Sequence, residues 1–301
     1  MRETFIEKRF SAATLATIEQ ANTILDEYER QGLVLTLRQV YYQFVSRGLM
    51  PNKQTEYKRL GSILSDGRLA GLIDWDMMED RTRRLNTINA WGSPAAIISA
   101  SADQYQEDLW KDQPWRPEVW IEKDALVGVL ERPCEELRVP YFACRGYSSQ
   151  SAQYAAGQRF RRYRAEGQTP IVFHLGDHDP SGIDMTRDNA DRLGMFSRLG
   201  AQGVEVERLA LNMDQVTQYN PPPNPAKDTD SRAVDYIAKY GTESWELDAL
   251  EPTVIVNLIR DAVTPLIRQK NWKAAVKAEE RGRNNLQRVS NNWDDIVADL
   301  P

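Results

Sequence analysis

Hydrophobic residues recur at helical spacing in three segments near the start of the chain. The first segment spans residues 12–30 and predicts an amphipathic helix. The second spans residues 35–48, where Thr36 and Gln39 stand at the spacing of a capping box. The third covers residues 55–69. These patterns predict three short helices in succession.

The segment after the third helix has a different pattern. In GLIDWDMMEDRTR (residues 71–83) the chain alternates between apolar and polar positions and turns, as a small β-wing does. Three short helices followed by a wing are the outline of a winged-helix DNA-binding unit. We therefore predict a winged-helix domain within residues 1–112.

Short apolar runs begin after WKDQPWRPE, a stretch spaced by proline and tryptophan. They alternate with helical segments, which predicts a parallel sheet covered by helices on both faces. The runs are VWIE (119–122), VPYFAC (139–144), PIVFHLG (170–176) and VEVERLAL (204–211). The predicted fold class is α/β, with the sheet domain in residues 113–224.

Prolines mark the end of the sheet region. The segment NPPPNPAKD (220–228) fits neither a helix nor a central strand, because proline lacks an amide hydrogen. We expect a linker or surface loop there. Beyond it the pattern is helical, with a break at Pro265. We expect residues 225–301 to form a helical C-terminal extension that packs on the sheet domain.

The composition is that of a soluble globular protein. Hydrophobic residues make up 41% and charged residues 27% of the 301 residues, which excludes a disordered chain and a disulfide-stapled miniprotein. No apolar run approaches the length of a membrane helix, and the start of the chain lacks the apolar core of a secretion signal. The two cysteines fit a reducing compartment. We expect a cytoplasmic protein with no membrane partner.

Basic residues gather locally although the formal net charge is −6. Residues 31–70 hold six Arg or Lys against two acids, and residues 145–166 hold five Arg against one acid. Counterion release depends on the charges that touch phosphate, so such stripes outweigh the total charge. The simpler explanation of each stripe by itself is a solvated helix face. The predicted DNA contacts are Arg145, Arg159, Arg161, Arg162 and Arg164.

Three acidic residues stand at the ends of two predicted strands. Glu122 ends VWIE, whereas Asp177 and Asp179 follow IVFHLG with side chains that point the same way. The carboxyl ends of parallel strands line the functional crevice of an open α/β sheet. Carboxylates gathered there repel one another unless a cation joins them, and oxygen ligands suit Mg²⁺. The pattern therefore predicts a magnesium site that would lie against a phosphate.

Two alternatives apply to these strand ends. An Asp-x-Asp-Pro-Ser-Gly segment is by itself more simply a turn whose Asp residues cap a helix, and Glu122 is what favours the metal site. His174 and His178 lie four residues apart, but in a strand and a loop. A zinc site would need a third ligand that the pattern does not supply, so we expect buried or surface histidines rather than ligands.

A tyrosine pair is the second candidate for chemistry. On a helical wheel Tyr41 falls within the apolar stripe, whereas Tyr42 falls outside it and shares a face with Arg38. A tyrosine hydroxyl, with a pKa near 10, is a poor nucleophile unless its proton loss is assisted or the developing charge is stabilised. Arg38 and a metal-bound phosphate would provide that help. The simpler explanation is a partly exposed tyrosine with an arginine stacked on it.

Taken in order, these motifs resemble the A subunit of topoisomerase VI and the related meiotic double-strand-break transesterases. LRQVYY precedes the predicted wing, and a Toprim-like Glu and an Asp-x-Asp-Pro-x-Gly motif follow it, as in that family. RLGSILSDGRLAG (59–71) and RGYSSQ (145–150) resemble two further family segments. The resemblance covers residues 35–184, about half of the chain.

The resemblance implies a role for each matching residue. Tyr42 matches the attacking tyrosine and Arg38 the arginine four positions before it. The residues that match the Toprim metal ligands are Glu122, Asp177 and Asp179, with Lys123 and Asp184 as further candidate site residues. Two positions depart from the family: its Gly-Lys-Gly-Tyr lysine is Arg145 here, and an expected arginine falls on Gln153, which lacks the charge for that DNA contact.

The family implies a winged-helix domain followed by a Toprim domain, in a homodimer that cleaves both strands of double-stranded DNA. Mg²⁺ would assist Tyr42 of one protomer, acting beside the other protomer's carboxylates, and leave a 5′-phosphotyrosyl intermediate. A separate GHKL-type ATPase B subunit is a further candidate partner, and a nucleoid-associated location follows. Two alternatives stay open: a Toprim nuclease without a covalent intermediate, and a non-cleaving DNA-binding factor that needs a partner ATPase.

Overall fold

The computed structural model describes residues 2–78, 90–200, 203–226, 230 and 232–298. The chain begins with three helices, as the periodicity predicts, and they share a core of their own. Ser11 caps the first helix, and Thr36 and Gln39 form the predicted capping box on the second. The helices are α1 (Ala12–Glu29), α2 (Leu37–Ser46) and α3 (Gln54–Leu69).

The predicted wing is not a strand pair in the part that the structure describes. Residues 71–78 form turns and bends, with an isolated bridge between Leu35 and Met78, and Ile73 and Met78 pack in the core of the three helices. The remainder of the predicted wing, residues 79–83, lies outside the described residues. A single bridge makes no ladder, so alternation of apolar residues overstated strand formation here.

Four parallel strands form the main sheet, which confirms the predicted α/β class. Its order is β2-β1-β3-β4, and Val119 of β1 lies opposite both Tyr141 of β2 and Phe173 of β3. The strands are β1 (Trp115–Ile121), β2 (Tyr141–Ala143), β3 (Thr169–Leu175) and β4 (Glu205–Ala210).

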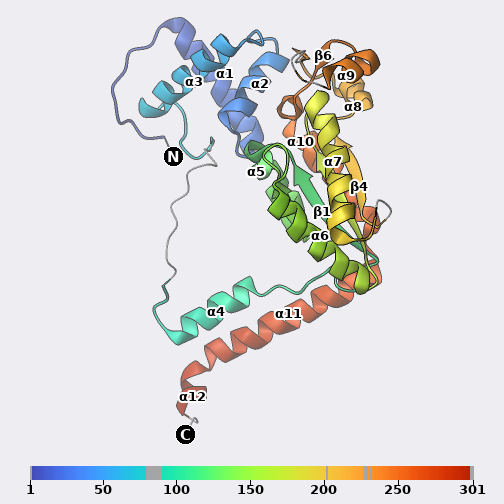
Figure 1. Cartoon of the computed structure of the whole chain (residues 1–301). Coiled ribbons are helices and arrows are strands. Elements are labelled where there is room, and N and C mark those ends of the chain that lie inside the picture. Colours follow the sequence, from blue (N-terminus) through green and yellow to red (C-terminus); the bar gives the residue numbers. More distant parts are fainter. Residues whose placement is uncertain (1, 79–89, 201–202, 227–229, 231, 299–301) are drawn as a thin grey trace.

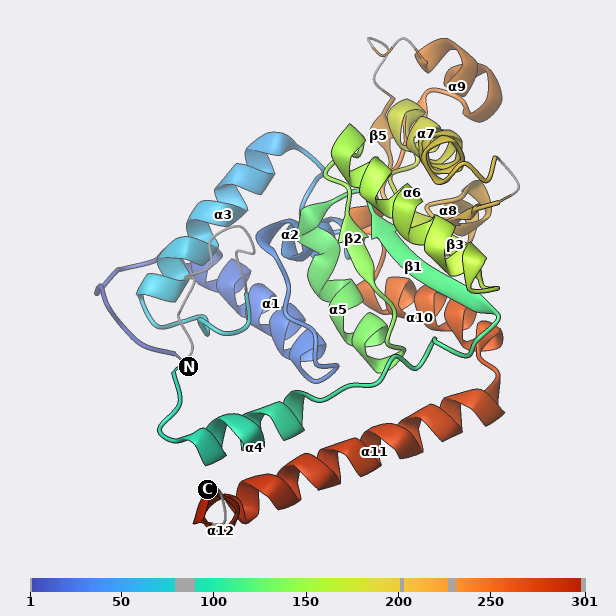
Figure 2. The same ribbon diagram turned by 60° about the horizontal axis from the view of Figure 1, so that its bottom comes forward.

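Helices cover both faces of this sheet, again as predicted (Figures 1 and 2). On one face, side chains such as Ile121 and Phe173 pack with α5 (Val127–Glu136) and α10 (Pro252–Val263). On the other face, Trp120 and Val172 pack with α6 (Gln150–Ala165) and α7 (Pro180–Ser197). Alternate residues of each strand therefore serve two different cores.

Residues 232–263 are part of the sheet domain rather than an appended extension. The proline-rich segment leads into a two-stranded antiparallel sheet, and α10 completes a face of the main core. Trp245 and Leu247 belong to that same core. The added elements are α8 (Met213–Tyr219), β5 (Asn224–Pro225), α9 (Ala233–Tyr240) and β6 (Glu243–Ser244).

Two helices far apart in the sequence form an arm that projects from the body (Figures 1 and 2). They are α4 (Pro94–Gln104) and α11 (Gln269–Asn291), and α12 (Trp293–Ala298) ends the described chain. Ser290 donates a hydrogen bond to the carbonyl of Ala95, and Arg283 to that of Tyr105. Thus α4, expected within the N-terminal domain, pairs with the C-terminal region.

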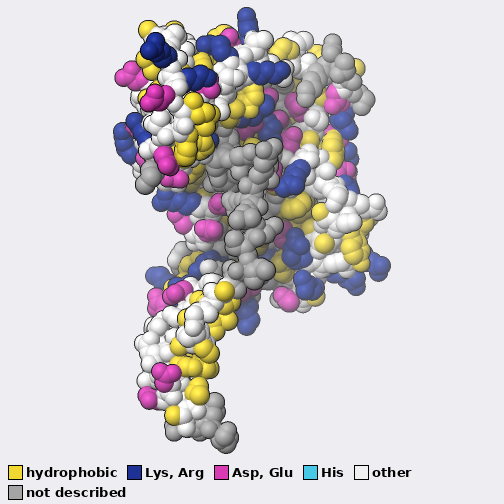
Figure 3. All heavy atoms as spheres, turned by 90° about the vertical axis from the view of Figure 1, so that its left-hand side faces the viewer, with side chains coloured by type: hydrophobic (Ala, Val, Ile, Leu, Met, Phe, Trp, Pro, Cys, Tyr) yellow, Lys and Arg dark blue, Asp and Glu magenta, His cyan; other side chains and the backbone are white. Residues whose placement is uncertain are grey.

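The surface of the arm carries hydrophobic side chains among polar ones (Figure 3). Ile97 and Val289 are among those exposed. Within the described ranges, no helix combines the length and the apolar character needed to cross a membrane.

Candidate functional site

The three predicted acids meet at the carboxyl ends of β1 and β3. Glu122, Asp177 and Asp179 line one cavity of about 470 Å³, which Arg145 also borders. The backbone N–H of Asp177 donates to Oε2 of Glu122 at 2.9 Å, so the two strand ends are directly joined. The strand pattern therefore located these side chains correctly.

The loop that carries Asp177 and Asp179 is tightly built. Oδ1 of Asp179 caps α7 by accepting the N–H of Gly182 at 2.6 Å, which confirms that this residue serves as a helix cap. A Cβ on Gly182 would lie 2.1 Å from the carbonyl oxygen of Asp177, so only glycine fits. Arg208 donates to the carbonyl of Asp177 at 2.6 Å and to that of Gly182 at 2.8 Å.

Burial and crowding change the acidity of the cluster. Burial, together with the charges of Asp177 and Asp179, raises the pKa of Glu122 to about 7, although the Asp177 amide and Lys123 act against this rise. Burial likewise raises the pKa of Asp177, against the opposing charge of Lys123. The folded chain thus holds these acids at a cost that a bound cation would relieve.

Lys123 lies at the centre of a second group of acids. Its Nζ is 2.9 Å from Oδ2 of Asp177, 2.9 Å from Oε2 of Glu246 and 3.0 Å from Oδ2 of Asp248. Burial opposes the ammonium charge, but the three carboxylates outweigh it and raise the pKa of Lys123. Lys123 therefore stays charged across the physiological range.

The tyrosine pair lies in an adjoining cavity of about 360 Å³. Arg38, Tyr42 and Asn224 are among its lining residues. The guanidinium carbon of Arg38 is 5.7 Å from the ring centre of Tyr42, so the two share a face as predicted. Tyr42 is not on an open surface, however: it is only 4% exposed, as is Tyr41. The segment around Ala249 packs against the N-terminal core and covers this side of α2.

The two tyrosine hydroxyls have different surroundings. Oη of Tyr41 accepts the N–H of Lys53 at 2.7 Å, and its single O–H has the carbonyls of Pro51 and Lys53 within hydrogen-bond distance, so the hydroxyl is fixed by this turn. Burial and the charge of Glu246 raise the pKa of Tyr42 to about 12, against the opposing effect of Arg38. Tyr42 is therefore protonated at neutral pH and needs a group that takes its proton.

Arg38 links the tyrosine to the acids within one chain. Its guanidinium forms ion pairs with Glu246 and, at 3.1 Å, with Asp248. Arg38 and Glu246 line both cavities. Burial opposes its charge, but the Glu246 carboxylate outweighs this and raises the pKa of Arg38. The N-terminal helices and the sheet domain are thus joined at the candidate site.

The remaining predicted residues lie elsewhere. Asp184 accepts a hydrogen bond from Tyr147 at 2.6 Å and pairs with Arg187 and Arg232, and it does not line the acidic cavity. Arg159 is committed to the buried carboxylate of Glu118 at 2.6 Å.

The other predicted DNA contacts are exposed. Arg145 lies beside the acidic cavity and pairs with Asp124 at 3.2 Å. Arg161, Arg162 and Arg164 lie on the exposed face of α6.

Both histidines are buried. His174 is fully buried, and its Nδ1 lies 2.8 Å from the hydroxyl of Thr186. His178 packs among aromatic rings, with Nδ1 2.7 Å from the hydroxyl of Tyr236. Among the residues that the structure describes, no group of three or more His, Cys, Asp or Glu is arranged to hold a metal ion as it stands.

The oxygen-rich donor set nevertheless has the chemistry of a hard-cation site. The ligand atoms that the side chains of Glu122, Asp177 and Asp179 offer are carboxylate oxygens, which bind Mg²⁺ better than they bind softer metals. One oxygen of Asp177 is taken by the N–H of Leu247 and the other by Lys123. The ligand type therefore suits Mg²⁺, but the side chains would have to change conformation to coordinate it.

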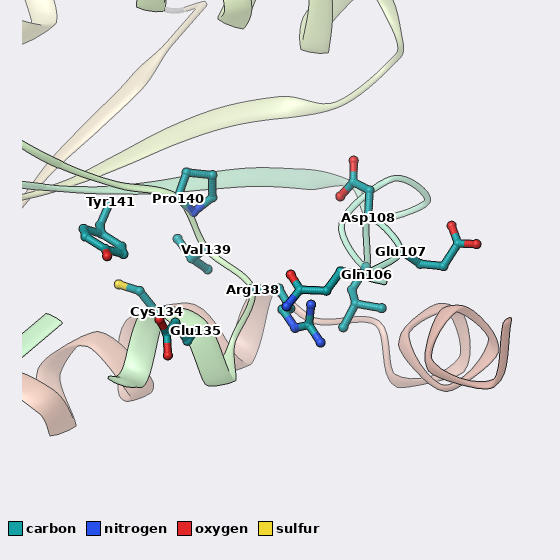
Figure 4. A pocket seen from close by; sticks show the side chains of 10 residues that line it. Gln106, Glu107, Asp108, Cys134, Glu135, Arg138, Val139, Pro140 and Tyr141 are labelled. Carbon is teal, nitrogen blue, oxygen red and sulfur yellow. The ribbon is translucent and has the colours of Figure 1, made fainter. Parts of the chain in front are cut away.

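A separate cavity of about 560 Å³ lies between the end of α5, the edge strand β2 and the segment before β1 (Figure 4). Arg138 borders it and pairs with Glu279 of the arm at 3.0 Å. Tyr141 and Cys134 lie at its other end. None of the predicted site residues lines this cavity.

Glu246, Asp248 and Asn224 were missed by the sequence reasoning. Glu246 and Asp248 stand two residues apart, as Asp177 and Asp179 do, which is the one signal that the sequence offered. They follow no strand of the main sheet, so the rule that places functional residues at strand ends does not find them.

No family model matches this chain, and no curated protein matches it.

Proposed function

We propose that this chain cleaves double-stranded DNA by tyrosine transesterification, as the topoisomerase VI A subunits that it resembles do. The observation that carries the proposal is the pair of adjoining cavities that share Arg38 and Glu246. One cavity holds the Tyr42 side chain, and the other holds the carboxylates at the strand ends. A phosphodiester bound between them meets a nucleophile on one side and an electrostatic site on the other.

The reaction exchanges one phosphoester for another. Oη of Tyr42 attacks phosphorus and loses its proton, the bond between phosphorus and O3′ breaks, and O3′ takes up a proton. The 5′ end stays on Tyr42 as a phosphotyrosine, so the break can be resealed by the reverse reaction.

Arg38 and Glu246 assist from the shared wall. Arg38 stabilises the charge that develops on the phosphate oxygens. Burial acts to raise the pKa of Glu246, but Lys123 and Arg38 outweigh it and hold that pKa below its ordinary value. Glu246 is thus ionised, and it borders the cavity that Tyr42 lines.

Glu122, Asp177 and Asp179 would hold Mg²⁺ in this proposal. The ion would neutralise the charge on the phosphate and position it. In the same proposal α1–α3 act as the winged-helix domain, the four-stranded sheet is the Toprim domain, and the exposed arginines of α6 bind the DNA backbone. Its partners are double-stranded DNA, a second copy of the chain and a GHKL-type ATPase.

The test is cleavage of a supercoiled plasmid with Mg²⁺, followed by abrupt denaturation and detection of protein on DNA ends. We expect adducts with the wild type, none with Tyr42→Phe, and adducts with Tyr41→Phe, because the Tyr41 hydroxyl is held by the turn at Lys53. Equal adduct yields from wild type and Tyr42→Phe would refute the assignment of the nucleophile.

Mixing two inactive variants determines whether Tyr42 and the carboxylates that act with it come from the same chain or from two chains of a dimer. The family resemblance implies that Tyr42 acts beside the partner's carboxylates, whereas here Tyr42 already adjoins those of its own chain. If the parts act across the dimer, Tyr42→Phe mixed with Asp177→Ala regains adducts. If they act within one chain, the mixture stays inactive.

A second candidate is a Toprim nuclease that hydrolyses DNA without a covalent intermediate. The burial of Tyr42 and its raised pKa favour this alternative, because both oppose nucleophilic attack. Cleavage that leaves no adduct and survives Tyr42→Phe would establish it. DNA binding without any cleavage would instead point to a binding factor that depends on a partner ATPase.

A further inference from the structure

Three carboxylates from distant parts of the chain surround one ammonium group. Asp177 follows β3, Glu246 and Asp248 come from the segment after β6, and Lys123 follows β1. All three contacts to Nζ lie between 2.9 and 3.0 Å. The arrangement is that of a cation in an oxygen cradle, with the cation supplied by a side chain.

Asp248 gives a second, independent sign of a binding position. Its side chain is fully buried, and its Oδ1 has no hydrogen-bond partner among the described residues. Asp248 also lines the acidic cavity. A buried carboxylate oxygen without a partner costs free energy unless something binds it, so this oxygen is suited to a further cation contact.

We propose that Asp177, Glu246 and Asp248 form a second cation position, which Lys123 fills in place of a divalent ion. The inference rests on the proposed function in one respect: the first position, made by Glu122, Asp177 and Asp179, is the one assigned to Mg²⁺. Asp177 belongs to both positions. The site then operates with one divalent ion and one tethered ammonium.

Distances explain why the second position selects an ammonium as it stands. Oxygens at 2.9–3.0 Å match the length of a charge-assisted hydrogen bond, whereas Mg²⁺ needs oxygens at about 2.0–2.1 Å. Without Lys123, Arg38 alone would offset the three carboxylates, and their remaining negative charge would draw in a divalent ion. Glu246 and Arg38 are also paired, so the cation position is connected to the tyrosine cavity.

The test counts Mn²⁺ ions bound to the metal-free full-length chain, by electron paramagnetic resonance of free Mn²⁺ and by titration calorimetry. We expect one ion per chain for the wild type, two for Lys123→Ala, and one for Lys123→Arg, which keeps the charge. Lys239→Ala, at an exposed lysine of α9, is the matched control and should bind one ion. Adding Asp248→Asn to Lys123→Ala should return the count to one.

An unchanged ion count in Lys123→Ala would overturn the inference. If the wild type bound no ion and Lys123→Ala bound one, the second position at Asp177, Glu246 and Asp248 would be supported and the Mg²⁺ position at Glu122 refuted. The two proposals can therefore fail separately. If Lys123→Ala does not fold without metal, Mn²⁺ should restore its cooperative melting. Failure of Mn²⁺ to do so would also overturn the inference.

Discussion

At the end of β1, the Glu122 carboxylate lies against the loop that carries Asp177. Burial and the neighbouring acids raise its pKa to about 7, so the folded state binds this proton more tightly than the unfolded state does. Because this pKa is raised on folding, Glu122 lowers the stability of the metal-free chain progressively as pH rises from about 4.5 to 7. The cost falls on a residue that we assign to metal binding.

Replacing Glu122 should therefore stabilise the metal-free protein. We expect Glu122→Gln to exceed the wild type by about 3 kcal/mol in free energy of unfolding at pH 8, with the difference vanishing below about pH 4.5. Urea denaturation in the presence of a chelator measures this. Glu118→Gln is the matched control and should destabilise instead, since it leaves Arg159 without its buried partner. If Glu122→Gln were instead less stable than the wild type at pH 8, the ionised Glu122 carboxylate would not be destabilising the metal-free chain.

Helix α6 separates its arginines by function. Arg159 faces the sheet and pairs with Glu118, whereas Arg161, Arg162 and Arg164 face solvent. The sequence alone showed one basic stripe, and the helix divides it because Arg161 and Arg164, two and five positions after Arg159, point to the opposite side of the helix. The phosphate-binding prediction therefore applies to the three exposed residues, while Arg159 has a structural role.

Neutralising the exposed face of α6 should weaken binding to any duplex. We expect the triple change of Arg161, Arg162 and Arg164 to Gln to reduce the slope of log affinity against log salt by about 2 to 3, as lost phosphate contacts do. Fluorescence anisotropy with a labelled duplex at several salt concentrations measures the slope. Arg159→Gln should lower the melting temperature and leave the slope unchanged. An unaltered slope in the triple variant would show that this face does not contact DNA.

Over the whole molecule, the C-terminal third of the chain completes structures that begin near the N-terminus. Residues 243–263 supply part of the main core and the acids that hold Lys123 and Arg38. The arm pairs α4 with α11 outside the body (Figure 2). The boundary predicted at residue 225 therefore separates parts that fold together.

Two truncations distinguish these roles. A chain of residues 1–224 loses Trp245, Leu247 and Ile259 from the main core, so we expect it to lack near-ultraviolet circular dichroism and cooperative melting. A chain of residues 1–273 removes most of the arm but keeps Trp272 against Trp110, and it should still melt cooperatively. Cooperative unfolding of the 1–224 chain would show that these residues fold without the C-terminal region, as the predicted boundary implies.

The fold class and the predicted acids of the strand ends were accessible from the sequence, whereas the complete site was not. Glu122, Asp177 and Asp179 follow apolar runs, and strand ends of a parallel sheet converge. Tyr42 was correctly paired with Arg38, but the sequence did not show that Tyr42 shares a buried core with Ala249, whose segment packs against α2. The hydrophobic pattern of α2 carries no information about contacts with a segment about 200 residues later in the chain.

The sequence by itself determined the first three helices, the capping box of α2 and the apolar runs of the four parallel strands, because these patterns depend on residues close together in the chain. Thr36 and Gln39 formed the predicted capping box, and the helical pattern broke at Pro265 as expected. Tertiary structure alone decided that Arg38 meets Glu246, 208 residues later, and that Lys123 occupies an acidic cradle. Such contacts depend on how whole helices and strands pack, and packing brings together side chains that no local pattern relates.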